Sequence, residues 1–228
     1  MKTALVTGAS SGIGQAICQM LLNKGYHVYG IGRTFTTKQD EHFIPIVCDL
    51  KIISKLLEQM KEIKAQATLD LLVNCAGVGY YGLHEELNAA KIHEMVTVNL
   101  EVPMVLTNFF LRDLKKQKGT IINISSVTAQ KSNPHGCAYG ATKAALSSFS
   151  TSLFDEARKY GVKVISIQPD MTKTNLYRNA NFKEGTTTDT YLLPSDVADA
   201  INYLLDCRID IVPTQLTLQP QRHQITKK

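Results

Sequence analysis

Three side chains in this 228-residue chain have the types and the spacing that proton transfer needs. Tyr139 and Lys143 are four residues apart in a segment with helical periodicity, so they share one helix face. A phenol is a poor acid–base catalyst at neutral pH, and a neighbouring ammonium favours its charged form. Ser126 follows an apolar run, and its hydroxyl can reach the same substrate oxygen. We therefore expect Tyr139 to be a general acid and base, although a Tyr-x-x-x-Lys pair alone is most often structural.

A glycine-rich turn joins the first apolar run directly to the first helical segment. Residues 7–14 read Thr-Gly-Ala-Ser-Ser-Gly-Ile-Gly. In a strand–turn–helix unit, such glycines let backbone N–H groups approach a pyrophosphate at the helix N-terminus. The turn predicts a dinucleotide site, with a glycine turn that binds nothing as the alternative; the residues expected to contact the cofactor are Gly8, Ser10, Ser11, Gly12, Ile13 and Gly14.

The end of the second predicted strand indicates which dinucleotide is preferred. An acidic residue there holds the ribose 2′-hydroxyl of NAD, whereas an arginine accommodates the 2′-phosphate of NADP. This chain has Arg33 at that position and no acidic residue before Asp40. We expect NADP(H) to be the cofactor, unless Arg33 is simply a solvated surface residue.

These residues need a scaffold, and the chain alternates short β-branched runs with longer helical stretches. The pattern predicts one domain over residues 1–228: an α/β, Rossmann-type doubly wound parallel sheet of about seven strands flanked by helices. Pro103 should kink the long helix between the fourth and fifth strands. A polar stretch without periodicity, about 170–193, is predicted to be an active-site lid. The strands are expected at residues 3–7, 27–31, 44–48, 69–74, 120–125, 163–168 and 215–218, and the helices at 12–23, 51–64, 87–116, 139–160 and 194–207.

Composition excludes several other classes of protein. Hydrophobic residues make up 44% and charged residues 20%, as in ordinary globular proteins. The net charge of +5 is scattered, so we expect no nucleic-acid partner, and no apolar run approaches the length of a membrane span. The five cysteines have no CxxC spacing and are typical of reduced cytoplasmic thiols. The six histidines show no ligand spacing, so no metal is expected.

Taken together in chain order, these motifs resemble the short-chain dehydrogenase/reductase family. The turn matches TGxxxGxG, and Tyr139 with Lys143 matches YxxxK. Asp49 matches the family's adenine-contacting Asp, and Asn99 matches its helix Asn. Residues 74–77, Asn-Cys-Ala-Gly, match NNAG with Cys in the second place. The resemblance covers nearly the whole chain.

The resemblance implies that the protein interconverts a small-molecule carbonyl compound and its alcohol with a nicotinamide cofactor. Tyr139 would protonate the carbonyl oxygen, Ser126 would orient it, and Lys143 would lower the Tyr pKa and hold the nicotinamide ribose. Asn99 would feed a water-mediated proton relay. Its main-chain carbonyl is free in a regular helix because Pro103 has no N–H to donate to it. The alternative is a kink that only fits the helix to its neighbours. Further cofactor contacts are implied for Leu50, Asn74, Ala76, Gly77, Pro169, Thr172 and Thr174.

Some features depart from the family pattern or leave alternatives open. Asp170 replaces the glycine that usually follows Pro169, which puts the local backbone in doubt, and residues 216–222 lack the usual Asp-Gly-Gly segment. A homodimer or homotetramer is expected from apolar stripes on two helices, unless these stripes pack on the sheet. The alternative functions are a 3-oxoacyl-thioester reductase, for which Lys173, Arg178 and Lys183 would bind an acidic carrier, and a non-catalytic NADP(H)-binding redox sensor.

Overall fold

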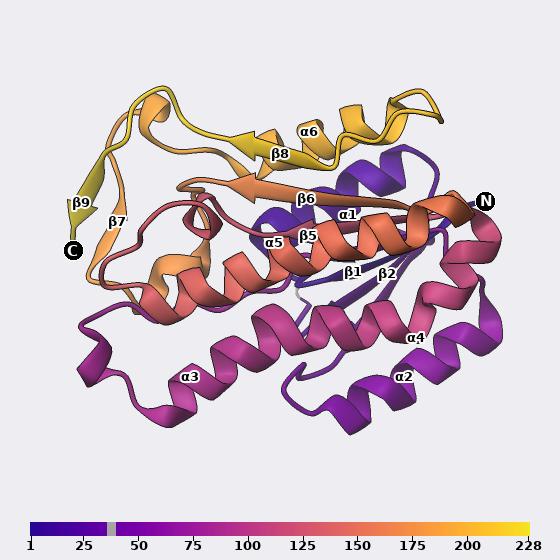
Figure 1. Cartoon of the computed structure of the whole chain (residues 1–228), viewed down its shortest axis with the longest axis horizontal. Helices are drawn as coiled ribbons and strands as arrows, with labels where there is room; N and C mark the ends of the chain where they lie inside the picture. The colour runs from indigo at the N-terminus through magenta and orange to yellow at the C-terminus, as the bar shows by residue number, and fades with distance from the viewer. Residues whose placement is uncertain (36–39) are drawn as a thin grey trace.

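Seven parallel strands form one twisted sheet in the computed structural model, which describes residues 1–35 and 40–228 (Figure 1). The strand order β3-β2-β1-β4-β5-β6-β8 reverses direction at β1. This doubly wound order confirms the predicted Rossmann-type fold. The strands are β1 (Thr3–Thr7), β2 (His27–Gly32), β3 (Phe43–Val47), β4 (Leu71–Asn74), β5 (Thr120–Ile124), β6 (Lys163–Pro169) and β8 (Gln215–Leu218).

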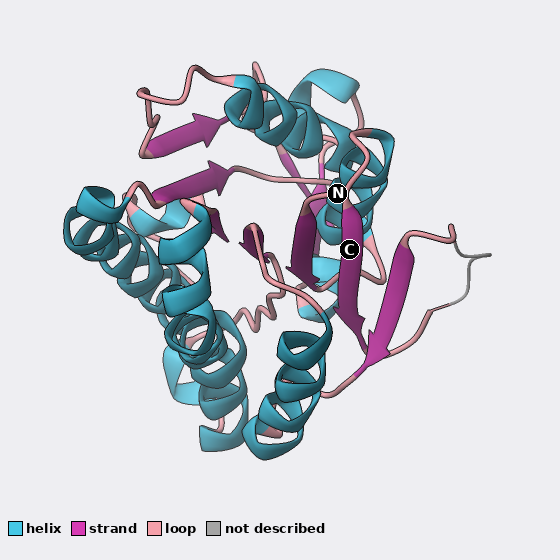
Figure 2. Cartoon of the chain, turned by 90° about the vertical axis from the view of Figure 1, so that its right-hand side faces the viewer, coloured by secondary structure: helices cyan, strands magenta, loops and turns pink. Residues whose placement is uncertain are grey.

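Helices cover both faces of the sheet, which explains why the central strands read as continuous apolar runs (Figure 2). All five residues of β1 and all four of β4 are buried. One face packs on α2 (Ile53–Gln66), α4 (Val102–Gln117) and α5 (Cys137–Ala157). The other face packs on α1 (Gly12–Asn23) and α6 (Pro194–Asp206). The sheet is therefore a rigid base for the loops at its carboxyl edge.

The long helix predicted before β5 is divided at Pro103. It consists of α3 (Ala89–Val96), a π-helical turn over Thr97–Glu101, and α4, in which Pro103 occupies the first turn. The N–H of Val102 donates to the carbonyl of Thr97, five residues earlier. Proline is tolerated in a first turn because no helical partner is required there. The sequence predicts a kink here, and the structure has one π turn immediately before α4.

The apolar stripe of α5 is buried within the chain itself. Leu146 is 1% exposed and Leu153 is 6% exposed, and Phe149 packs against the same core from a partly buried position. The alternative reading, in which this stripe packs on the sheet, is therefore correct for Leu153, and Leu146 is buried as well.

The segment after β6 contains structure that the sequence pattern did not predict. A 3₁₀ turn over Asn175–Asn179 is followed by strand β7 (Phe182–Glu184) and a second turn over Thr188–Thr190. β7 pairs antiparallel with β9 (Ile225–Lys227), far from β7 in the sequence, and the pair forms a separate small sheet at one end of the molecule (Figure 1). Within the described parts of the chain, no helix combines the length and apolarity that crossing a bilayer requires.

Candidate active site

One cleft at the carboxyl edge of the sheet collects most of the residues that the sequence singled out. It opens where the strand order reverses, which is where ligands bind in open α/β sheets. Tyr177 and Arg178, which sequence reasoning did not name as cofactor contacts, also line it. Among the predicted site residues, the cleft is lined by Gly8, Ser10, Ser11, Gly12, Ile13, Gly14, Arg33, Asp49, Leu50, Ala76, Gly77, Ser126, Tyr139, Lys143, Pro169, Thr172 and Thr174.

The glycine turn forms a close-packed floor for this cleft. Gly8 has φ of +70°, and a Cβ there would lie 2.9 Å from the Cα of Ala76. A Cβ on Gly14 would collide with the carbonyl of Gly8. Below the turn, Thr7 Oγ1 accepts hydrogen bonds from the N–H groups of Cys75 and Ala76, each at 3.0 Å. The turn therefore exposes backbone where a side chain would block it, as a pyrophosphate site requires.

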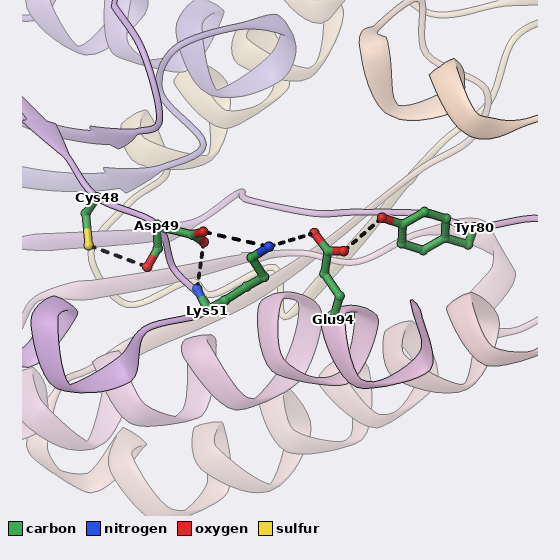
Figure 3. Close-up of polar contacts among 5 residues, drawn as sticks. All are labelled: Cys48, Asp49, Lys51, Tyr80 and Glu94. Carbon is green, nitrogen blue, oxygen red and sulfur yellow. Dashed lines mark hydrogen bonds and ion pairs between the residues drawn. The ribbon is translucent and has the colours of Figure 1, made fainter. Parts of the chain in front are cut away.

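A chain of polar contacts crosses the rim of the cleft beside the predicted adenine contact (Figure 3). Asp49 Oδ1 accepts from the backbone N–H of Lys51 at 3.0 Å. The Lys51 ammonium lies 3.7 Å from Asp49 Oδ2 and 3.8 Å from Glu94 Oε1 on α3. Glu94 also accepts from the Tyr80 hydroxyl at 2.8 Å, and this bond is the main reason why the Tyr80 pKa is raised. The contacts join the turn after β3 to α3 and to the loop after β4.

Ser126, Tyr139 and Lys143 all line the cleft and are nearly fully buried. Ser126 is held in extended backbone conformation just after β5, and its Oγ accepts from the N–H of Thr128 at 3.2 Å. Lys143 Nζ donates to the carbonyl of Ile124 at 2.8 Å and lies 5.8 Å from the centre of the Tyr139 ring. The first two turns of α5 thus present both side chains toward the end of β5.

Burial controls the protonation of this group. It raises the pKa of Tyr139 to about 12, while the neighbouring Ser126 hydroxyl acts in the opposite direction. It lowers the pKa of Lys143 to about 8, and the nearby Cys75 thiol partly opposes that shift. The net shift of the Tyr139 pKa is therefore upward, opposite to the lowering expected from Lys143, because desolvation disfavours both charged forms. At neutral pH, Tyr139 carries its proton and is suited to donate it.

Two predicted site residues, Asn74 and Asn99, do not line the cleft. Asn74 Nδ2 donates to Asn123 Oδ1 at 2.8 Å and links β4 to β5. Asn99, which is fully buried, exchanges two 2.9 Å hydrogen bonds with the backbone of Val78, and its Nδ2 also donates to Thr142 Oγ1 at 3.1 Å. The Asn99 side chain therefore braces the loop after β4, which leaves its main-chain carbonyl as the group for the relay expected from the sequence.

Asp170 needs no glycine-like backbone. Its φ is not positive, and its N–H donates to the carbonyl of Leu218 at 2.9 Å. Its carboxylate accepts from the N–H of Met171 at 2.8 Å and from Gln219 Nε2 at 3.1 Å. The replacement of glycine by Asp170 therefore does not disturb the local backbone, because Asp170 starts the turn with its own side chain.

Thr174, farther along the same segment, reaches the glycine turn, since a Cβ on Gly12 would lie 3.1 Å from Thr174 Cγ2.

An aromatic cluster beside Tyr139 was not predicted. The Tyr81 ring centre lies 5.7 Å from that of Tyr139, 5.8 Å from that of Tyr177 and 5.1 Å from that of Phe182. Tyr177 and Phe182 are themselves 5.6 Å apart. Burial raises the pKa values of Tyr81 and Tyr177, so both phenols stay neutral. Tyr81 comes from the loop after β4, and Tyr177 and Phe182 come from the segment after β6. No sequence periodicity links these two segments, so their only signal in the sequence is the presence of several tyrosines.

No group of three or more His, Cys, Asp or Glu side chains in residues 1–35 and 40–228 is arranged to hold a metal ion. All five cysteines are free thiols, and burial raises the pKa of Cys75 to about 12. The chemistry available at this cleft is therefore that of a phenol, a hydroxyl and an amine beside a glycine turn.

Comparison with known proteins agrees with this geometry. Residues 2–185 match the family model described as short chain dehydrogenase. A 3-oxoacyl-[acyl-carrier-protein] reductase of Buchnera aphidicola is 32% identical over 79% of this chain and 77% of its own length. An alcohol dehydrogenase of the archaeon Thermococcus sibiricus, solved with 5-hydroxy-NADP, is 26% identical with a TM-score of 0.87 and covers 98% of this chain and 99% of its own.

A 4-hydroxyisoleucine dehydrogenase solved with NADH has a TM-score of 0.86 at 25% identity, covering 96% of this chain and 98% of its own. The structural relatives thus include proteins complexed with either type of nicotinamide cofactor. The family match, the sheet order and the cleft lead to one conclusion: this chain is an oxidoreductase of the short-chain dehydrogenase/reductase family.

Proposed function

We propose that the protein is an NADP(H)-dependent oxidoreductase that interconverts a ketone or aldehyde and its alcohol by hydride transfer. The observation that carries this proposal is that Ser126, Tyr139 and Lys143 line the same cleft as the glycine turn and Arg33. When bound, the nicotinamide supplies or accepts the hydride. The residues of this chain bind the two substrates, orient the oxygen and move the proton.

Tyr139 is the general acid in the direction of carbonyl reduction. Its pKa of about 12 means that the phenol holds its proton at neutral pH and can donate it to the developing alkoxide. Ser126 lies in the cleft with Tyr139, and its hydroxyl orients the same oxygen and stabilises the phenolate that remains. In alcohol oxidation Tyr139, as the phenolate, accepts the proton of the alcohol as a general base, and Ser126 orients the same oxygen.

Lys143 holds the ribose hydroxyls of the nicotinamide end and returns a proton toward Tyr139. Its Nζ is fixed by the Ile124 carbonyl, and Gly77 leaves room beside it, since a Cβ at that position would lie 3.6 Å away. The same position lies 3.7 Å from Asn99 Oδ1. We place the water of the proton relay in this space, between Lys143 and the π turn that contains Asn99. The water would donate a hydrogen bond to the main-chain carbonyl of Asn99.

The cofactor preference rests on Arg33. This residue lines the cleft immediately after β2, where a guanidinium matches the 2′-phosphate of NADP. The remaining contacts are the glycine turn for the pyrophosphate, Asp49 with Leu50 for the adenine, Ala76 with Gly77 along the loop after β4, and the segment containing Pro169, Thr172 and Thr174 for the carboxamide. Asn74 lies behind that loop, in β4, where it donates to Asn123.

Replacing Arg33 tests that preference. Loss of one charge-assisted contact to a phosphate should raise the Kd for NADPH about thirtyfold in Arg33→Ala and leave the Kd for NADH unchanged. Fluorescence titration of both cofactors measures this, with Arg112→Ala on the exposed side of α4 as the control arginine. An equal effect on both cofactors would show that Arg33 does not select the 2′-phosphate.

A second candidate is a 3-oxoacyl-thioester reductase. Arg178 lines the cleft, Lys173 and Lys183 lie in the same segment, and a reductase of this type from Buchnera aphidicola is 32% identical. An acidic carrier protein would meet these three cations. Saturation kinetics with an acyl-carrier thioester separate the candidates: a KM at least about tenfold below that of the free thioester favours the carrier reductase.

We further propose that the enzyme is a homodimer or homotetramer of the cytoplasm. Val96 and Met104, at the outward side of α3 and α4, are 41% and 43% exposed, which is consistent with a covered surface in an oligomer. The free cysteines are consistent with a reducing compartment. Light scattering coupled to size-exclusion chromatography gives the oligomeric state directly.

The reaction itself is tested by NADPH consumption against ketones, aldehydes, diketones and 3-oxoacyl thioesters. At least one carbonyl compound should give saturable turnover that requires the nicotinamide cofactor. Binding of NADPH without turnover on the whole panel would instead favour the redox-sensor alternative.

A further inference from the structure

Residues 220–228, which we call the strap, fasten the lid segment (residues 170–193). Strand β9 of the strap pairs antiparallel with β7 of the lid segment, with Phe182 opposite Lys227, Lys183 opposite Thr226 and Glu184 opposite Ile225 (Figure 1). A two-stranded pair of this length is marginal by itself in water. Other contacts must therefore help to hold it.

Side chains at both ends of the strap provide these contacts. At one end, the Arg222 guanidinium binds Asp189 through both carboxylate oxygens, at 2.5 and 3.0 Å, and its backbone N–H donates to the Asp189 carbonyl at 2.9 Å. At the other end, the N–H of Lys228 donates to the carbonyl of Asn181 at 2.9 Å, and its ammonium donates to the carbonyl of Tyr177 at 2.7 Å. The strap thus holds the lid segment at three separate places.

The held segment carries Tyr177 and Phe182, whose rings pack on Tyr81. Tyr81 in turn packs on Tyr139, so a continuous line of ring contacts of 5.1 to 5.8 Å runs from β7 to the proton donor. Tyr177 also lines the cleft, whereas no described residue of the strap does so. The strap therefore lies outside the site and is connected to it through the aromatic cluster.

We propose that the strap is a positioning element that fixes Tyr177 against the substrate side of the cleft and thereby sets the KM for the carbonyl substrate. This inference rests on the proposed carbonyl–alcohol chemistry. Neutral, buried aromatic rings favour an apolar or aromatic substituent on the carbonyl compound. The backbone pairing and hydrogen bonds of the strap go to residues 177–189, beyond Thr172 and Thr174, which we assign to the cofactor. The glycine turn and Arg33 belong to the other end of the cleft, so the strap leaves cofactor affinity unchanged.

The first experiment removes residues 223–228, which eliminates β9 and Lys228. Hydrogen–deuterium exchange in residues 175–190 should rise about tenfold while exchange in the main-sheet strands stays the same. The KM for acetophenone should rise about tenfold, with kcat within about threefold and the Kd for NADPH within about twofold of the unaltered protein. Unchanged exchange in the lid segment would overturn the proposal, as would faster exchange with an unchanged KM.

The second experiment uses the ion pair, so that a poorly folded truncation is not the only evidence. Arg222→Asp should raise the KM for acetophenone, and the double variant Arg222→Asp with Asp189→Arg should restore it. Lys24→Gln, which removes an exposed ion pair with Asp206 away from the lid segment, is the matched control and should leave the KM unchanged. A KM that rises in the single variant and is not restored by the exchange of charges contradicts the proposal.

A failure of the proposed function remains distinguishable from a failure of the strap. If the unaltered protein reduces no carbonyl compound, the proposed function fails. Saturation-transfer NMR of acetophenone with the NADPH-loaded protein then decides the strap proposal. Weaker binding of acetophenone after truncation supports it, and equal binding rejects it.

Discussion

The two ends of the cleft are built by different means. At the cofactor end, buried strands hold the glycine turn, and Thr7, which is 1% exposed, binds two N–H groups of the loop after β4. At the lid end, three-residue strands and the exposed pair of Arg222 with Asp189 hold the aromatic cluster. The comparison suggests that cofactor binding is fixed by the core of the protein, whereas substrate binding is set by contacts that can be changed without disturbing the core.

The strongest test of the cofactor end replaces Gly8. Gly8 and Gly25 have nearly the same left-handed φ, +70° and +76°, but a Cβ would meet a neighbour only at Gly8, where it would lie 2.9 Å from the Cα of Ala76. Gly8→Ala should raise the Kd for NADPH about a thousandfold, because the turn must move away from its binding geometry. Gly25→Ala should share the backbone strain, about 1–2 kcal/mol, and keep its NADPH affinity. Equal affinities in fluorescence titrations would show that the turn is not the pyrophosphate site.

A second test uses the titration of Lys143, which lies between the two ends. Because its pKa falls from 10.5 to about 8 on folding, the unfolded chain binds more protons between these values, and stability rises with pH in this window. Lys143→Met lacks this dependence. The free energy of unfolding of Lys143→Met minus that of the unaltered protein should therefore fall by about 3 kcal/mol as the pH rises across this window. Urea unfolding at several pH values measures it. A constant difference would mean that the buried amine is not desolvated.

The test with the smallest expected effect compares the contacts that hold the two ends of the cleft. Thr7→Val leaves two partly buried N–H groups without an acceptor and should lower the free energy of unfolding by about 2 kcal/mol. Arg222→Gln removes only an exposed ion pair and should leave thermal stability nearly unchanged, although it loosens the lid segment. Calorimetry of the two variants checks this. A larger loss of stability in Arg222→Gln than in Thr7→Val would show that the lid end, and not the cofactor end, depends on contacts that stabilise the core.

The same contrast explains what could be predicted from the sequence. Every strand of the main sheet lies within two residues of its predicted position, because buried strands need continuous β-branched runs that are visible in the sequence. The glycine turn, Ser126, Tyr139 and Lys143 were found for a related reason: their chemistry depends on residue type and local spacing. All of them line one cleft.

The strap and the aromatic cluster left no such signal. β7 and β9 contain three residues each, with one apolar residue apiece, and they pair across a long sequence separation that no periodicity encodes. The pKa of Tyr139 was misjudged because the sequence indicates which charges are near but not how deeply they are buried. Pro103 correctly indicated an interruption, while the π turn that accommodates it depends on packing around Asn99.

Proton donation by Tyr139 in carbonyl reduction is the step on which the proposed function depends. The most direct measurement is kcat for NADPH-dependent reduction by Tyr139→Phe, with NADPH affinity measured on the same samples and Tyr203→Phe on the exposed face of α6 as the control. Loss of the general acid should lower kcat about a thousandfold with NADPH affinity intact, while the control keeps full activity. Turnover by Tyr139→Phe at the rate of the unaltered protein would contradict the account.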